Sequence, residues 1–129
     1  MSIIRNVLGE NLSPCSLDPM TGYHRDGYCQ CGDEDRGQHI ICVQVTQEFL
    51  LYSRSRGNDL MTPFPQYGFP GLKAGDRWCL CLSRWIEALD AGMAPPVILD
   101  ATHENVLARV PLETLKDYAL DASETAQQT

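Results

Sequence analysis

Two segments of the chain alternate between apolar and other side chains with a period of two residues, which is typical of β-strands. They are residues 39–45 and residues 78–82. One face of each is apolar, with Ile41, Val43 and Val45 in the first segment and Trp78, Leu80 and Leu82 in the second. The other faces carry Ile40, Cys42 and Gln44 in the first segment and Cys79, Cys81 and Ser83 in the second. The pattern therefore predicts two strands that turn sulfur away from an apolar face.

Each of these strands leads into a predicted amphipathic helix with a capping residue before it and a glycine after it. Thr46 is a candidate N-cap for a helix over residues 47–56, and Gly57 ends that helix. After the second strand, Ser83 is a candidate N-cap and Gly92 ends the helix. Because start and stop residues agree with the apolar pattern, these two strand–helix units are the best-defined part of the chain.

A third unit repeats the same order more weakly. Residues 97–101 are predicted to form a strand, and Thr102 precedes a helix over residues 103–109. Pro111 suits the first position of a last helix, which extends to about residue 120. Consecutive strand–helix units favour some parallel pairing in the sheet.

Long irregular segments complete the chain. Residues 1–38 contain closely spaced turn formers, and residues 57–75 contain three prolines together with Phe64, Tyr67 and Phe69. We expect residues 57–75 to form an ordered flap whose rings pack on the core, because disordered linkers lack aromatic residues. The prediction is a single α+β domain over residues 1–129, with a small sheet, helices mainly on one face and long coil segments covering the other.

Charge and cysteine content narrow the function classes. The chain has 129 residues and a net charge of −7, which argues against binding to nucleic acid or to an anionic membrane. The first residues lack the apolar run of a secretory signal, so we expect a cytoplasmic protein. In that compartment the six cysteines would be reduced unless they bind metal or react.

The sulfur-bearing faces form the most interesting surface that the pattern predicts. If both strands belong to one sheet, their thiols meet in a hollow beneath the N-terminal coil and the flap. Three interpretations stay open: buried filler, a zinc site, or a cysteine nucleophile with a histidine base. The candidate metal ligands are Cys29, His39, Cys42, Cys79, Cys81 and His103, and the catalytic candidates are Cys79, Cys81 and His103.

Charged residues near the turns are candidate contacts for a small molecule. They are Arg25, Asp59, Asp76 and Arg77, with Arg84 as a further cation. These residues could pair with one another or bind a carboxylate or phosphate. No glycine-rich nucleotide loop or His-Glu-x-x-His zinc-protease motif is present, so nucleotide hydrolysis and zinc-protease chemistry are poor candidates.

Several short motifs together resemble a known family. The chain carries Asn6-Val7-Leu8-Gly9, Thr21-Gly22-Tyr23, Arg25-Asp26-Gly27, Gly57-Asn58-Asp59-Leu60, Phe69-Pro70-Gly71-Leu72-Lys73, Gly75-Asp76-Arg77-Trp78-Cys79-Leu80-Cys81, Arg84-Trp85 and Ala101-Thr102-His103. With these motifs it resembles the DUF2237 family of small uncharacterised proteins. The resemblance implies a compact α+β core over residues 6–120 and no obligatory partner domain. The polar composition of residues 121–129 separately predicts a frayed tail. That family has threonine where this chain has Cys31, so Cys31 is a poor candidate for a required ligand.

Two hypotheses about function follow. The first is a small-molecule-binding protein or enzyme with a pocket under residues 57–75. The second is a non-catalytic interaction module or a zinc-stabilised module, in which the cysteines are structural. The sequence leaves open whether the protein is an enzyme and whether it forms a homodimer.

Overall fold

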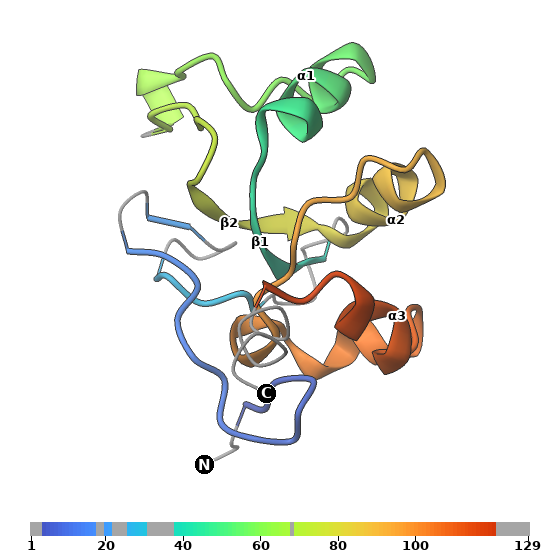
Figure 1. Ribbon diagram of the computed structural model, residues 1–129. Coiled ribbons are helices and arrows are strands. Elements are labelled where there is room, and N and C mark those ends of the chain that lie inside the picture. The colour runs from blue at the N-terminus through green and yellow to red at the C-terminus, as the bar shows by residue number, and fades with distance from the viewer. Residues whose placement is uncertain (1–3, 18–19, 22–25, 31–37, 68, 121–129) are drawn as a thin grey trace.

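The structure, a computed structural model, has the predicted α+β fold, and its described residues form a small antiparallel sheet and three α-helices (Figure 1). It describes residues 4–17, 20–21, 26–30, 38–67 and 69–120. The tail predicted to be frayed, residues 121–129, lies outside this part. None of the helices formed by the described residues has the length and apolar character needed to cross a membrane.

The regular elements are few and short. The strands are β1 (His39–Gln44) and β2 (Arg77–Cys81), and the α-helices are α1 (Gln47–Ser55), α2 (Leu82–Asp90) and α3 (Leu112–Asp117). Three 3-10 helices cover Pro65–Tyr67, Leu99–Ala101 and Glu104–Ala108. In Figure 1, α2 and α3 lie to the right of the strands, and the blue N-terminal segment lies to their left.

The two strands pair antiparallel, so the expectation of parallel pairing is wrong. Cys42 lies opposite Cys79, and Val43 lies opposite Trp78. The register shifts between His39 and Ile41, where the sheet has an irregularity. The predicted shared face of Ile40 and Cys42 is also wrong. Ile40 belongs to the main core, whereas Cys42 belongs to a separate cluster.

The prediction of a third strand over residues 97–101 is also wrong. Val97 makes only isolated bridges, antiparallel to Val43 and parallel to Ala119. The chain then turns into a 3-10 helix, in which the N–H of Ala101 donates to the carbonyl oxygen of Ile98 at 3.2 Å. The hydroxyl of Thr102 donates to the same carbonyl oxygen at 2.8 Å. These bonds use a backbone acceptor that a sheet ladder would need, and so they end the extended conformation.

The predicted ends of α1 are confirmed. The hydroxyl of Thr46 accepts from the backbone N–H of Phe49 at 3.1 Å, which is an N-cap bond. At the other end, the N–H of Gly57 donates to Arg54 at 3.1 Å and the N–H of Asn58 donates to Ser53 at 2.9 Å. This pair of bonds is a Schellman motif, and it needs the positive φ of 90° that glycine supplies.

Helix α2 begins earlier than its sequence suggests. It follows β2 directly, so Cys81 is the N-cap residue and the predicted capping role of Ser83 is wrong. The stop at Gly92 is confirmed, because the N–H of Met93 donates to Ala88 at 2.7 Å. Helix α3 begins one residue after the predicted position, with Pro111 as its N-cap residue.

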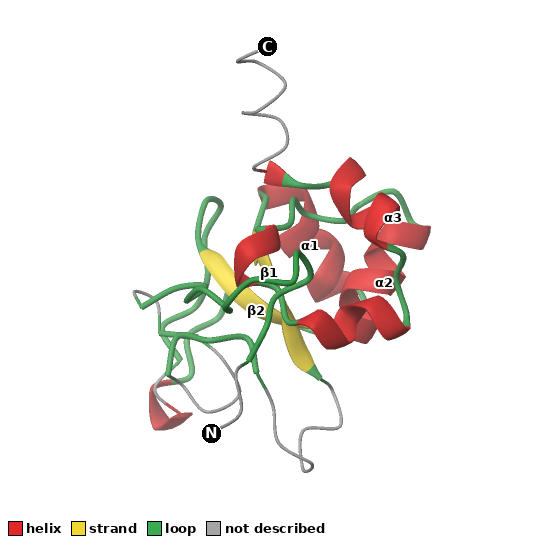
Figure 2. Ribbon diagram, turned by 90° about the horizontal axis from the view of Figure 1, so that it is seen from below, coloured by secondary structure: helices red, strands yellow, loops and turns green. Residues whose placement is uncertain are grey.

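The buried side chains form two separate clusters. The larger one joins the apolar strand residues to the helices and has Trp85 as its largest fully buried member. The indole N–H of Trp85 donates to the carbonyl oxygen of Pro95 at 3.2 Å, and its ring packs edge-on against Tyr118 at 5.7 Å. The smaller cluster contains Cys15, Cys29, Cys42, Cys79, Ile98 and Ala101. Figure 2 shows the loops that run beside the strands.

One buried polar residue fixes the N-terminal segment. The side-chain oxygen of Asn6 accepts from the N–H groups of Leu8 and Glu10 at 2.9 and 3.0 Å. Its amide donates to the carbonyl oxygens of Asn11 and Asp100 at 3.3 and 3.0 Å. Asn6 is 1% exposed, and these four bonds tie a turn-rich segment to a part of the chain 94 residues away.

Among the described glycines of the flap, Gly71 is the one where a side chain is least tolerable. It has a φ of 80°, and a Cβ atom there would lie 2.5 Å from the carbonyl oxygen of Met61. Gly75 has a φ of 98° with nothing within 4 Å of such an atom. We expect Gly75→Ala to lower the free energy of unfolding by about 1 kcal/mol through the left-handed conformation alone. Gly71→Ala should lower it by about 1–2 kcal/mol more, since the backbone must also move.

The measurement is urea denaturation of both variants beside the unaltered protein. Equal losses of unfolding free energy for the two variants would contradict the close packing of Gly71 against Met61.

Candidate functional site

Four of the six cysteines form two disulfides, so the expectation that these four are reduced thiols is wrong for this structure. Cys15 is bonded to Cys42 of β1 with 5.7 Å between the Cα atoms. Cys29 is bonded to Cys79 of β2 with 5.1 Å between the Cα atoms. The expectation rested on compartment alone, whereas the fold brings these backbones within the usual disulfide range of about 4.4–6.8 Å.

The predicted meeting of Cys42 and Cys79 on one side of the sheet is confirmed by their direct pairing. The two disulfides also lie against each other, because the sulfurs of Cys15, Cys29 and Cys79 are all within 4.8 Å of one another. All four cysteines are buried, and Ile98 and Ala101 complete the cluster. The sulfur-bearing face is therefore packed, and the open space lies next to it.

Two buried threonines hold the strands at this cluster. The hydroxyl oxygen of Thr102 accepts from the N–H of Cys42 at 3.1 Å. The hydroxyl oxygen of Thr21 accepts from the N–H of Cys79 at 2.8 Å. Both threonines are fully buried, so each strand finds a side-chain partner where a third strand would otherwise supply a carbonyl group.

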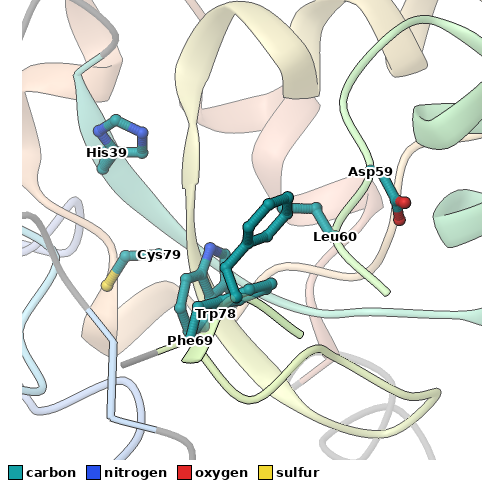
Figure 3. A pocket seen from close by; sticks show the side chains of 7 residues that line it. His39, Asp59, Leu60, Phe69, Trp78 and Cys79 are labelled. Atoms are coloured by element: carbon teal, nitrogen blue, oxygen red, sulfur yellow. The ribbon is translucent and has the colours of Figure 1, made fainter. Parts of the chain in front are cut away.

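The open space is a cavity of about 340 Å³ beneath the flap of residues 57–75. Its lining consists of His39, Asp59, Leu60, Phe64, Phe69, Trp78 and Cys79. Figure 3 shows His39 and Cys79 on one side of the cavity and Asp59 on the other, with Phe69 and Trp78 between them. The wall is thus mainly aromatic, with polar groups at its two ends.

The flap is closed over this cavity by backbone bonds. The N–H of Leu72 donates to the carbonyl oxygen of Leu60 at 2.7 Å, and Phe64 and Phe69 exchange two bonds of 2.9 and 3.1 Å. The ring of Phe69 packs edge-on against Trp78 with centroids 5.3 Å apart, so the expected packing of the flap on the core is confirmed at this ring. Phe64 stays 43% exposed at the rim.

Asp59 shapes one end of the cavity. Its Oδ1 accepts from the N–H groups of Met61 and Thr62 at 2.9 and 3.2 Å, and its Oδ2 accepts from the Thr62 hydroxyl at 2.6 Å. The Thr62 hydroxyl bond, followed by the Met61 N–H bond, lowers the pKa of Asp59 below its ordinary value. The carboxylate therefore stays ionised, and its hydrogen bonds hold the turn at the start of the flap.

A second cavity of about 240 Å³ adjoins the first. It shares His39, Leu60 and Trp78 with the first cavity and adds Asn58, Leu80, Cys81 and Arg84. The Nη1 atom of Arg84 contacts Glu87 Oε1 at 3.3 Å and donates to the carbonyl oxygen of Arg56 at 3.2 Å. Cys81 is half-buried and is a free thiol. Together the two cavities follow β2 from Trp78 to Cys81.

The other predicted contacts are placed elsewhere. Asp76 accepts from the backbone N–H of Lys73 at 3.0 Å and so braces a turn before β2. Arg77 is exposed at the start of β2. Neither residue is part of the lining of the two cavities. Arg25 lies outside the described residues.

His103 is held by its own backbone neighbourhood. It is the N-cap residue of the 3-10 helix Glu104–Ala108, and its Nδ1 accepts from the N–H of Asn105 at 3.0 Å. Partial burial lowers the pKa of His103, and the smaller effect of Glu104 opposes this. Among the described contacts none joins His103 to a thiol, so its proposed role as a catalytic base has no geometric support.

Sequence reasoning did not count Cys15 among the candidate ligands, and it missed four residues that line the first cavity and two more that line the second. The predicted metal ligands Cys29, Cys42 and Cys79 lie together in the sulfur cluster, while His39 and Cys81 line the cavities. Cys15 belongs to the cluster, but it lies in coil with no periodic pattern that would indicate its direction. The missed residues are Leu60, Phe64, Phe69 and Trp78 in the first cavity and Asn58 and Leu80 in the second. The aromatic residues among them were assigned to packing.

The Cys15–Cys42 bond should make a large contribution to stability in the oxidised protein. For its sequence separation of 27 residues, loop entropy predicts about 3–4 kcal/mol. We expect the double variant Cys15→Ala, Cys42→Ala to lose about that much unfolding free energy in urea without reductant. Cys81→Ala should lose less than about 1 kcal/mol, because it breaks no covalent link.

Alkylation before and after reduction provides a direct check. Mass spectrometry should find Cys15, Cys29, Cys42 and Cys79 unmodified until a reductant is added. Modification of any of these four in the denatured, unreduced protein would contradict the disulfide assignment.

A second prediction concerns pH. The pKa of His103 is lowered in the folded state, so the unfolded chain takes up a proton first as the pH falls below about 6.5. The contribution of neutral His103 to stability is therefore complete above that pH and is lost as the pH falls through the window just below it. His103→Asn keeps an acceptor for the Asn105 N–H and removes the titration.

Denaturation midpoints of both proteins at about pH 7.5 and about pH 5.5 measure this effect. The unaltered protein should lose more stability than His103→Asn over the interval. A loss of the same size in both would assign the pH dependence to other groups.

Two comparisons with known proteins bear on the family of the chain. A search of functionally curated proteins finds no match to it. The model of the family described as "Uncharacterized protein conserved in bacteria (DUF2237)" matches residues 5–119 of the 129 residues. The match spans most of the chain and covers all the motifs quoted from the sequence. The protein therefore belongs to the DUF2237 family.

Proposed function

We propose that this protein binds a small molecule in the cavity beneath residues 57–75. The observation that carries the proposal is the cavity of about 340 Å³ between the flap and β2. Small-molecule sites are usually concave and mainly apolar, with a few polar groups, and have volumes of roughly 300–1,000 Å³. The volume and lining of this cavity agree with the lower end of that range.

The lining favours a ligand with a flat apolar body. Phe69 and Trp78 meet edge-to-face in the wall, and Leu60 adds an aliphatic surface. A ring inserted here gains contact with both aromatic side chains. His39 and Asp59 lie at the ends, where they offer polar contacts to substituents of the ring.

The adjoining cavity favours an anionic group on the same ligand. Arg84 lines this second cavity, and its guanidinium has five N–H donors. The described contacts of Arg84, with Arg56 and Glu87, are made by its Nη1 atom. A carboxylate next to it would also lie near the N-terminus of α2, where negative charge is stabilised. The ligand class that fits both spaces is therefore a small aromatic acid.

The proposal is one of binding. If the site also catalyses a reaction, Cys81 is the candidate nucleophile in the oxidised protein, because Cys79 is held in a disulfide. His39 pairs with Cys81 across the two strands. Cys81 is therefore the residue to test for catalysis once a ligand has been identified.

The remaining partners and the location are still predictions. The net charge of −7 supports the absence of nucleic acid as a partner. The location expected from the sequence is cytoplasmic, where cellular thiols would hold the four paired cysteines in their reduced form. Self-association into a homodimer is a further prediction.

The aromatic sulfonate 1-anilinonaphthalene-8-sulfonate is a suitable probe, since it combines a flat apolar body with an anionic group. We expect saturable binding to the native protein, with chemical-shift changes at the Trp78 indole and His39. Phe64→Ala should weaken binding by about fivefold, because the loss of one ring contact is about 1 kcal/mol. Leu107→Ala is the matched control, since Leu107 is 41% exposed against 43% for Phe64 and lies outside both cavities.

Several results would count against the site. They are shift changes that map away from the flap, equal affinities for the two variants, or fluorescence that appears only in partly unfolded protein. If the probe binds in the cavity, a crystal structure with a bound aromatic acid would identify the polar contacts.

A further inference from the structure

The two neighbouring disulfides place the sulfur atoms of four buried cysteines in one cluster. The sulfurs of Cys15, Cys29 and Cys79 lie within 4.8 Å of one another, and Cys42 is bonded to Cys15. Within the described part of the chain, Cys15, Cys29 and Cys79 form the one group of three or more histidine, cysteine and acidic side chains with ligand atoms close enough to hold a metal ion. The cluster lies beside the small-molecule cavity but does not depend on it.

We propose that Cys15, Cys29, Cys42 and Cys79, when reduced, form a tetrahedral four-thiolate site for a zinc ion. A zinc–sulfur distance of about 2.3 Å requires the four sulfurs to lie about 3.8 Å apart. The sulfur of Cys15 already lies within 4.8 Å of the sulfurs of Cys29 and Cys79, which is at most about one ångström beyond that separation. Opening each disulfide moves its two sulfurs apart, toward the same value.

The backbone positions the ligands rigidly. Cys42 and Cys79 are directly paired across the sheet, and the buried hydroxyl groups of Thr102 and Thr21 hold their N–H groups. Cys15 is fixed through its N–H, which donates to the carbonyl oxygen of Gly27 at 2.6 Å. Two ligands thus come from strands and two from the coil that covers them.

This arrangement explains why no zinc motif is visible in the sequence. Most structural zinc sites take ligands in close pairs from tight turns. Here successive ligands are 14, 13 and 37 residues apart along the chain, and the pairing of β1 with β2 brings Cys42 and Cys79 together. The donor set of four buried sulfurs is the kind that selects zinc over magnesium or calcium.

The change between the two forms is balanced. Each disulfide accepts two electrons and two protons from one dithiol, which leaves as a disulfide, so two dithiols convert both bonds into four thiols. Zinc then displaces four protons and forms four zinc–sulfur bonds. The oxidised protein thus holds two disulfides and the reduced protein holds one metal ion at the same place.

The experiment starts with protein reduced by dithiothreitol in denaturant and refolded under nitrogen after the reductant is removed. Cobalt(II) is titrated in, and its absorption reports geometry and sulfur ligation. We expect saturation at one ion per chain with the intense bands of a tetrahedral thiolate complex, followed by displacement by zinc. The zinc-loaded protein should have a higher unfolding temperature than the reduced protein without metal.

Alkylation identifies the ligands without any substitution. In the zinc-loaded protein, Cys15, Cys29, Cys42 and Cys79 should resist iodoacetamide while Cys81 reacts. Cys15→Ser should weaken cobalt binding by about a hundredfold or more, and the control Cys81→Ser should leave it unchanged.

The proposal is overturned if the reduced protein shows no saturable cobalt binding, whether it stays folded or fails to refold when metal is added. It is also overturned by an octahedral spectrum, by protection of Cys81 in place of the four ligands, or by unchanged affinity in Cys15→Ser. None of these outcomes bears on binding of an aromatic acid, so the two proposals fail independently.

Discussion

The fold depends on the link between a two-stranded sheet and the coil that covers it. Two strands alone are at best marginally stable in water, because each leaves an edge and a face exposed. Here the helices cover one set of strand residues, and Cys15 and Cys29 attach the N-terminal coil to the other. The hydroxyl groups of Thr21 and Thr102 satisfy strand N–H groups at the same place. Without these attachments, the cysteine face of the sheet would lie open to water.

Local chemistry explains which elements the sequence predicts well. Thr46, Gly57 and Gly92 act through bonds to residues a few positions away, and all three have the predicted roles. The segment from Val97 to Ala101 looks like a strand because of its composition, but no neighbouring strand is available beyond single bridges. Its conformation is decided by Thr102 and by contacts distant in sequence, which no local pattern contains.

The site was predictable only in part, for a related reason. Alternation in two strands is enough to place Cys42 beside Cys79, and the composition of residues 57–75 is enough to predict an ordered flap whose rings pack on the core. The pairing of cysteines is different, because six cysteines allow 15 full pairings and coil residues have no fixed direction. Cys15 and Cys29 reach the sheet through turns whose geometry the sequence does not specify at this level.

The disulfides cross: in chain order, the first of the four bonded cysteines joins the third, and the second joins the fourth. This topology affects biosynthesis, because a ribosome releases the chain from its N-terminus. Cys29 must wait for its partner until 50 further residues have been made, although Cys42 emerges first. A nascent chain that oxidises early can therefore join Cys29 to the wrong thiol. Native connectivity requires either late oxidation or subsequent shuffling.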